Sequence, residues 1–145
     1  MKYMLGTNIC SYIIKNRPHE VHAKFKTLSM DDCCISSITY AELKYWVARN
    51  KRLHIKSKNQ SIPKVNEQVI NNFVSHLDIL EFGTHAADVY GEIRDFMAAA
   101  GLIVGNADLF IGAHAISLNL VLVTNNIKEF VHFPNIQLEN WVAPN

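Results

Sequence analysis

Oxygen-bearing side chains recur in this sequence just after short apolar runs or in the first turns of helix-like segments. The set consists of Thr7, Asn8, Glu42, Asp108, Thr124, Asn125, Asn126 and Glu129. Carboxylates, hydroxyls and amides without His or Cys are hard ligands, which suit Mg²⁺ or Mn²⁺ and not zinc. Ions held in this way activate a water and stabilise the charge that develops on a phosphate during in-line displacement. The set therefore predicts metal-dependent hydrolysis of a phosphodiester, if the fold brings its members together.

The elements that must position these residues alternate between strand and helix along the chain. We expect strands at 3–5, 33–36, 77–82, 120–123 and 136–138, and helices beginning at Thr7 or Asn8 and covering 36–49, 65–76, 85–101 and 106–119. The segment 51–64 is interpreted as a loop or a weak helix end. This alternation predicts a three-layer α/β/α sandwich with a mostly parallel sheet. Ligands bind such sheets outside the carboxyl ends of the strands, where the oxygen-bearing residues are expected.

Each member of the set also has a purely structural interpretation. Thr39 to Glu42 fits the capping-box pattern T-x-x-E, in which the glutamate only satisfies a backbone N–H. Asp108 fits an N-cap or first-turn acid, and Asn125 and Asn126 fit turn formers after a strand. Taken one at a time, the residues favour these structural roles. Their shared position at one edge of the predicted sheet favours a site.

Length and composition describe a single globular domain. The chain has 145 residues, of which 49% are hydrophobic and 19% are charged, a balance that argues against disorder. There is no apolar run of about 20 residues to span a membrane and no secretory signal, so we expect a cytoplasmic protein that does not engage membranes. Cys10, Cys33 and Cys34 show no metal-ligand spacing, and we expect buried, reduced thiols in preference to a zinc site or disulfide.

Charge is distributed unevenly between the two parts of the chain. Residues 1–64 contain 12 Lys and Arg against 4 Asp and Glu, whereas residues 65–145 contain 2 against 9. The segment 44–64 has seven basic residues and no acid, with Tyr45 and Trp46 among them. This composition is typical of a surface that binds a polyanion, and equally of a solvated helix and loop. If RNA binds here, its phosphates are expected to contact Lys44, Arg49, Lys51 and Arg52.

Four separated segments resemble one known family, in register over nearly the whole chain. They are "MKYMLGTNICSYIIKNRP", "ISSITYAEL", "GNADLFIGAHAISLNLVLVTNNIKEF" and "IQLENW". Together they resemble the PIN-domain toxins of the VapC type. The resemblance implies a single PIN domain over residues 1–145, usually dimeric, in a bacterial toxin–antitoxin complex with a VapB antitoxin. It also implies a Mg²⁺- or Mn²⁺-dependent ribonuclease, and the "TNN..EF" ending resembles the branch that cuts initiator tRNA in its anticodon stem-loop.

The family's site residues carry over unevenly onto this sequence. Its second acid falls on Glu42, its third on Asp108, and its conserved threonine on Thr124. The fourth acid is often an aspartate where this chain has Asn126, with Glu129 as an alternative source of the carboxylate.

The family's first acid, the aspartate of "LDTN", falls on Gly6. A glycine there removes one metal ligand, which we expect to reduce the rate by about a hundredfold to ten-thousandfold. An engineered or selected inactivating substitution is the preferred history, because a single base change converts Asp to Gly and a disabled toxin is easier to produce. A natural non-catalytic homologue that binds RNA or antitoxin is the alternative. A receiver-like signalling domain is disfavoured, because Gly6 and Asn126 occupy places where it needs acids.

Overall fold

Five short parallel strands form one sheet in the order β3-β2-β1-β4-β5. A computed structural model gives this fold and describes residues 1–57 and 63–144. The strands are β1 (Tyr3–Leu5), β2 (Cys33–Ser36), β3 (Asp78–Leu80), β4 (Val121–Val123) and β5 (Gln137–Glu139). The predicted parallel α/β/α architecture is confirmed, and the strands lie within one or two residues of their expected bounds.

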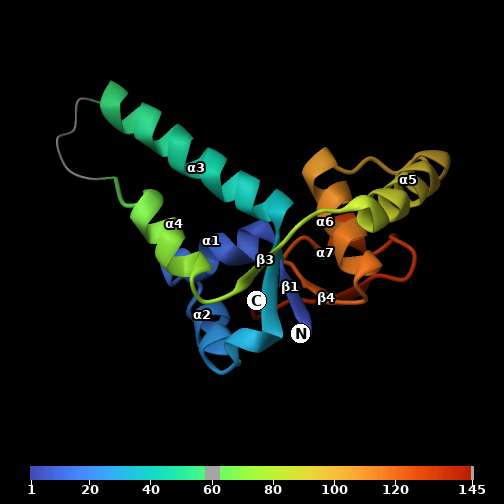
Figure 1. The fold of residues 1–145 in the computed structure, drawn as a ribbon, viewed down its shortest axis with the longest axis horizontal. Helices are drawn as coiled ribbons and strands as arrows, with labels where there is room; N and C mark the ends of the chain where they lie inside the picture. Colours follow the sequence, from blue (N-terminus) through green and yellow to red (C-terminus); the bar gives the residue numbers. More distant parts are fainter. Residues whose placement is uncertain (58–62, 145) are drawn as a thin grey trace.

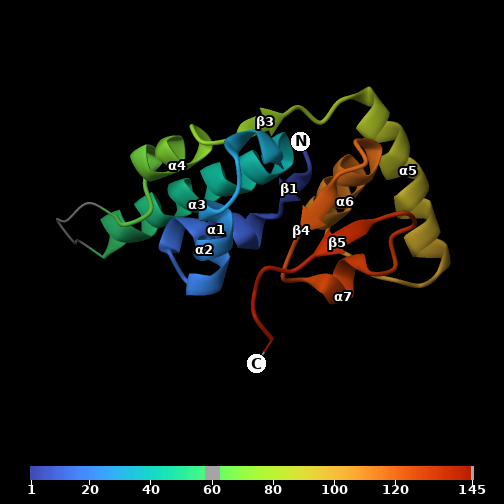
Figure 2. The same ribbon diagram turned by 90° about the horizontal axis from the view of Figure 1, so that it is seen from below.

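Helices cover both faces of this sheet (Figures 1 and 2). They are α1 (Thr7–Lys15), α2 (His19–Lys26), α3 (Ser37–Lys56), α4 (Glu67–Val74), α5 (Thr84–Ala99), α6 (Asn106–Ser117) and α7 (Ile127–Phe130), with a 3₁₀ turn at Met30–Asp32. In both views, α1 to α4 form one group and α5 to α7 the other, and the distal part of α3 extends away from the sheet.

The strands are buried on both faces, and their alternating side chains divide the core in two. In β1, Tyr3 and Leu5 pack into the core under α1, α3 and α4, whereas Met4 between them packs under α5 and α6. β4 follows the same rule, with Val123 in the first core and Leu122 in the second. This two-residue period explains why such short apolar runs support a three-layer fold.

The topological switch point of the sheet lies between the neighbouring strands β1 and β4. The chain proceeds from β1 outward to β2 and β3, and then returns to place β4 on the other side of β1. The helices after adjacent strands β1 and β4 therefore diverge to opposite faces and leave a crevice at the carboxyl ends of these strands. Gly6 follows β1 there and Thr124 follows β4, so the fold locates the predicted site at this point.

Several helix boundaries differ from the sequence-based expectation. Gly6 is the N-cap of α1, without a side-chain cap, so the expected Thr7 or Asn8 cap is wrong. α3 continues to Lys56, so the first part of the segment 51–64 is the end of a helix, one of its two expected interpretations, while 58–62 lie outside the described residues. α2 and α7 are absent from the sequence-based expectation, because each is short and the apolar periodicity of its sequence is weak over so few residues.

The cysteines agree with the expected reduced state. Cys10, Cys33 and Cys34 are all buried and free, so the disulfide alternative is wrong. Burial raises the pKa of Cys33 to about 11 and that of Cys34 to about 12. These thiols are therefore protonated at neutral pH and act as small core residues. Among the helices of residues 1–57 and 63–144, none combines the length and apolar character needed to cross a membrane.

Gly112 allows α6 to pack closely against the segment around α7. A Cβ added at Gly112 would lie 2.5 Å from Cε2 of Phe133 and 3.2 Å from Cδ1 of Phe130, both of them core side chains. We expect Gly112→Ala to lower the free energy of unfolding by about 1–3 kcal/mol because this core has no room for a methyl group. Urea denaturation checks this expectation, with Gly91→Ala as the control, because a Cβ there meets nothing within 4 Å. Equal stability of the two variants would contradict it.

Candidate metal and active site

A cleft of about 200 Å³ opens at the carboxyl ends of β1 and β4. It collects most of the residues predicted from the sequence, from elements far apart along the chain. Its lining consists of Gly6, Thr7, Asn8, Glu42, Asp108, Ile111, Thr124, Asn126 and Phe130. A larger hollow of about 490 Å³ lies elsewhere, between α1, α2 and α4, and no carboxylate lines it. The smaller cleft, which is lined by carboxylates, is therefore the candidate site.

Glu42 reaches the cleft from the second turn of α3. Ser36 is the N-cap of this helix, and its hydroxyl accepts a hydrogen bond from the backbone N–H of Ile38. The T-x-x-E pattern from Thr39 to Glu42 thus lies inside the helix and is not a capping box. Instead, the Glu42 carboxylate accepts a hydrogen bond from the hydroxyl of Thr7, which begins α1. Glu42 is available for chemistry, and Thr7 orients it.

Asp108 reaches the cleft from the first turn of α6, and its carboxyl meets that of Glu129 in α7. Gly105 is the N-cap of α6, so the interpretation of Asp108 as an N-cap is wrong. Burial, the hydrogen bond with Glu129 and the charges of Glu129 and Glu42 raise the pKa of Asp108 to about 7. Acids that are pressed together in this way are common where a cation normally compensates their charge.

Thr124 and Asn126, which follow β4, also line the cleft. Thr124 is buried, and its hydroxyl oxygen accepts a hydrogen bond of 2.9 Å from the backbone N–H of Asn126. Asn126 is the N-cap of α7 but makes no side-chain cap bond. The neighbouring Asn125 is directed away, toward Tyr12 and Asn140, which agrees with its interpretation as a turn residue.

Gly6 occupies the cleft at the end of β1 without contributing an oxygen-bearing side chain. Its φ of −72° and ψ of 164° suit any residue, so the backbone does not require glycine. A Cβ added there would lie 3.0 Å from the carbonyl oxygen of Val123 and 3.8 Å from Cβ of Thr124. The end of β4 must shift by a few tenths of an ångström to accept a side chain, which would then extend into the cleft lined by Glu42 and Asp108.

The oxygen ligands in and beside the cleft are of the type that binds a hard divalent cation, but few of them are carboxylates. Asp108, Glu129 and Glu42 offer carboxylate oxygens, and the contact between the Asp108 and Glu129 carboxyls is one that a cation would relieve. Within residues 1–57 and 63–144, however, no three His, Cys, Asp or Glu side chains are grouped closely enough to hold a metal ion. Position 6 is the place from which another carboxylate could enter.

The raised pKa of Asp108 predicts a pH-dependent stability. Between its ordinary value of 3.8 and about 7, the folded state binds the Asp108 proton more tightly than the unfolded state. Stability is therefore lost as pH rises through this window. Asp108 is partly exposed, so solvent screens part of this effect, and we expect Asp108→Asn to raise Tm by about 2–4 °C at pH 8 and by much less at pH 4. Melting curves at the two pH values check this, and an equal effect at both would contradict it.

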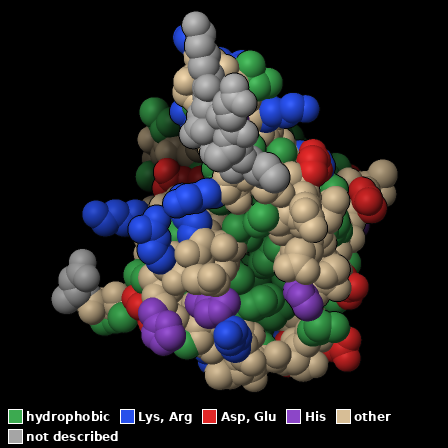
Figure 3. All heavy atoms as spheres, turned by 90° about the vertical axis from the view of Figure 1, so that its left-hand side faces the viewer, with side chains coloured by type: hydrophobic (Ala, Val, Ile, Leu, Met, Phe, Trp, Pro, Cys, Tyr) green, Lys and Arg blue, Asp and Glu red, His purple; other side chains and the backbone are tan. Residues whose placement is uncertain are grey.

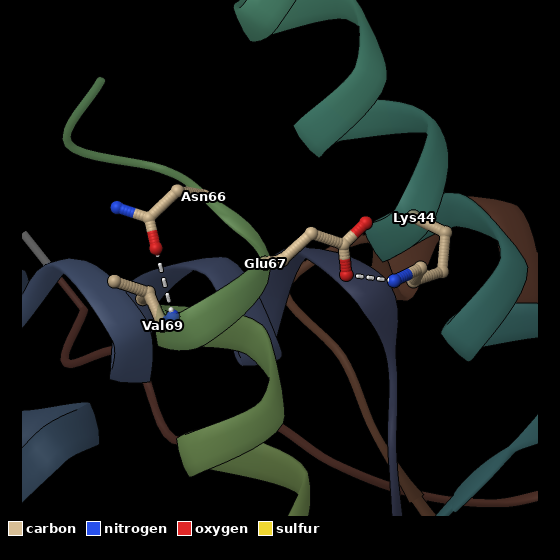
Figure 4. Close-up of polar contacts among 4 residues, drawn as sticks. All are labelled: Lys44, Asn66, Glu67 and Val69. Carbon is tan, nitrogen blue, oxygen red and sulfur yellow. Dashed lines mark hydrogen bonds and ion pairs between the residues drawn. The ribbon is translucent and has the colours of Figure 1, made fainter. Parts of the chain in front are cut away.

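The basic residues expected to contact RNA divide between two sides of α3. Lys44 forms an ion pair with Glu67, which begins α4 next to its N-cap Asn66 (Figure 4). Lys51, two turns later, lines a hollow together with Glu67. Arg49 and Arg52 are exposed. Lys44 and Lys51 thus lie on the α4 side of the helix, which their positions in the sequence do not reveal.

Sequence reasoning misses part of the cleft. Thr7 and Asn8 are expected at this edge of the sheet as polar residues after the first strand, and both line the cleft, but the hydrogen bond from Thr7 to Glu42 is not predicted. Ile111 and Phe130 form its apolar wall. Ile111 comes three residues after Asp108 in α6, a helical spacing that places both on one face, and this signal is present in the sequence.

Comparisons with known proteins agree with this geometry. Residues 3–135 match the model of the PIN domain family. The chain is 44% identical to "Ribonuclease VapC2" of Rickettsia felis, covering 97% of this chain and 98% of that protein. It is 39% identical to the "tRNA(fMet)-specific endonuclease VapC" of Salmonella typhimurium, with the same coverage. A crystal structure of VapBC2 from Rickettsia felis bound to a DNA fragment from their promoter superposes with a TM-score of 0.80 at 42% identity, covering 98% of this chain and all of that one.

Proposed function

Because this chain belongs to the PIN-domain family and is homologous to its VapC ribonucleases, we propose that it is the toxin of a VapBC-type pair, with an endoribonuclease site weakened by Gly6. The observation that supports this most strongly is the cleft in which Glu42, Asp108, Thr124 and Asn126 meet around a position without a side chain. Relatives over nearly full length are named a ribonuclease and a tRNA-specific endonuclease. The proposed cofactor is Mg²⁺ or Mn²⁺, and the proposed place of action is the bacterial cytoplasm.

The residues of the cleft have distinct proposed roles in cutting RNA. Glu42 and Asp108, with Glu129 beside Asp108, are the carboxylates that would contribute to a cation site, but they are not grouped closely enough to hold an ion without a further carboxylate at position 6. A bound cation would activate a water and neutralise charge on the scissile phosphate. Thr7 keeps the Glu42 carboxylate turned into the cleft by donating to it. The Thr124 hydroxyl oxygen accepts a hydrogen bond from the backbone N–H of Asn126, so its own proton remains available to donate a hydrogen bond to a phosphate oxygen. Ile111 and Phe130 form an apolar part of the lining, which would exclude water from that side of the cleft.

Transfer RNA is the proposed substrate, and the proposed cleavage site is the anticodon stem-loop of initiator tRNA. A relative at 39% identity is named a tRNA(fMet)-specific endonuclease. Gly6 would reduce cleavage by removing a carboxylate from the edge of the cleft, not by altering the fold, because the backbone there is ordinary extended chain.

A VapB-type antitoxin is the proposed partner, in a larger complex built on a toxin homodimer. Similar structures are those of VapBC pairs from Rickettsia felis and Salmonella typhimurium. Co-expression with the product of the neighbouring small gene tests the partner: the two chains should co-purify as one species in size-exclusion chromatography. Separate elution of two folded chains would contradict it.

A non-catalytic homologue that binds RNA or antitoxin is the second candidate, and Gly6 is the observation that favours it. The two candidates differ in what Gly6→Asp should do. The nuclease proposal requires metal-dependent RNA cleavage to appear in that variant, whereas a non-catalytic homologue gains nothing from the carboxylate.

A further inference from the structure

The outer face of α3 carries a tyrosine followed by three basic residues in one line. Tyr45, Arg49, Arg52 and Lys56 are spaced at i, i+4, i+7 and i+11, which places them on one stripe of the helix, and all four are exposed. We propose that this stripe binds a single-stranded segment of RNA, with Tyr45 stacking on a base. The inference rests on the proposed function, because it assumes that RNA is what the cleft cuts.

The stripe is continuous with the cleft. Glu42 lines the cleft and lies one helical turn before Tyr45 on the same helix. From Glu42 to Lys56 the helix advances by about 21 Å at 1.5 Å per residue. Figure 1 shows that this part of α3 projects from the body of the protein as an arm. A strand that enters the cleft can therefore continue along the arm.

Tyr45 differs from the other aromatic residues of α3 in its surroundings. The ring of Tyr40 lies 5.9 Å from the ammonium of Lys44, and the ring of Trp46 lies 5.2 Å from that of Lys15. Both are partly buried, whereas Tyr45 is 67% exposed. An exposed aromatic face beside cations is the arrangement on which unpaired bases stack, and this stacking tolerates any base.

Charge on this arm favours a negatively charged partner over a neutral protein surface. Glu42 is the only acid in α3, and it belongs to the cleft. Glu67, the nearest acid of α4, is paired with Lys44 on a different side of the helix (Figure 4). Figure 3 shows the α3–α4 end of the molecule, where several Lys and Arg side chains gather on one side of this face. RNA is the occupant whose phosphates and bases use both the cations and the ring.

The test measures binding of labelled RNA to the unaltered chain in EDTA, so that no cleavage interferes. The probes are an RNA hairpin with a seven-nucleotide loop and a blunt RNA duplex with the same number of phosphates. We expect Arg49→Gln/Arg52→Gln to weaken hairpin binding by about tenfold or more and to reduce the slope of log K against log salt by about 1.4. Lys24→Gln/Lys26→Gln removes two charges from α2 and should have little effect.

Tyr45 variants separate stacking from charge. Tyr45→Ala should weaken hairpin binding by about tenfold and leave duplex binding unchanged, whereas Tyr45→Phe, which keeps the ring, should bind as the unaltered chain does. Absence of RNA binding by the unaltered chain, equal losses in the α2 control, or no selective loss in Tyr45→Ala would each overturn the proposal. Loss of self-association in Tyr45→Ala without loss of RNA affinity would identify a protein interface instead and overturn it as well.

Failure of this inference is distinguishable from failure of the proposed function. If Gly6→Asp cuts RNA while the stripe variants bind normally, the nuclease stands and the stripe does not. If the stripe variants lose RNA affinity while Gly6→Asp cuts no RNA, the proposal that α3 binds RNA is supported and the nuclease proposal fails.

Discussion

Gly6→Asp is expected to raise RNA cleavage by about a hundredfold to ten-thousandfold and to arrest growth when expressed without antitoxin. The reason is local: residue 6 lines the same cleft as Glu42 and Asp108, its backbone dihedral angles suit any residue, and the end of β4 needs only a small shift to accept a side chain. The measurement is the initial rate of tRNA cleavage with Mg²⁺ or Mn²⁺, by gel electrophoresis, for both chains at equal concentration.

Two controls make this result specific. EDTA should abolish the new activity, because the cation is part of the proposed site. Gly6→Ala adds the Cβ that approaches the Val123 carbonyl at 3.0 Å but adds no ligand, so it should remain inactive. A Gly6→Asp chain that is folded and cuts no RNA would contradict the nuclease proposal and favour the non-catalytic homologue.

Glu42→Gln in the Gly6→Asp background is expected to lower the restored cleavage rate by about a hundredfold or more, since an amide is a poor substitute for a carboxylate ligand. Thr7→Val in the same background should lower the cleavage rate by only about tenfold, because it releases the Glu42 carboxylate from its hydrogen bond but leaves the carboxylate in place. The measurement is again the initial cleavage rate, now with the metal concentration varied.

The metal dependence distinguishes the two roles. Thr7→Val should recover much of its lost rate at high Mn²⁺, because its ligands remain, whereas Glu42→Gln should not. Ser11→Ala, at an exposed site in α1 outside the cleft, is a control that should leave the rate unchanged. Full activity of Glu42→Gln would show that the cleft is not where RNA is cut.

The sequence is informative wherever a local pattern determines structure. Apolar runs such as Tyr3–Leu5 and Val121–Val123 predict buried parallel strands, and the polar residues that follow them predict the edge where the cleft lies. Glu42, Asp108, Thr124 and Asn126 are expected there, and the fold brings them together. Parallel strands have this property because all their carboxyl ends meet at one edge.

The remaining features depend on contacts between segments far apart in the chain. Thr7 resembles a helix cap, and only the approach of α3 to α1 makes it the partner of Glu42. Asp108 resembles a first-turn acid, and only α7 brings Glu129 against it and raises its pKa. Charge alone groups Lys44 with the other basic residues of α3, whereas α4 places Glu67 beside it. Spacing along one helix could not reveal any of these three contacts.

The central claim is that the cleft is a divalent metal site from which Gly6 removes one carboxylate, and calorimetric titration with Mn²⁺ tests it most directly. We predict that the Gly6→Asp variant binds Mn²⁺ at least tenfold more tightly than the unaltered chain, and that adding Asp108→Asn abolishes this gain. Equal Mn²⁺ affinity of the unaltered chain and the Gly6→Asp variant, both folded, would contradict the account.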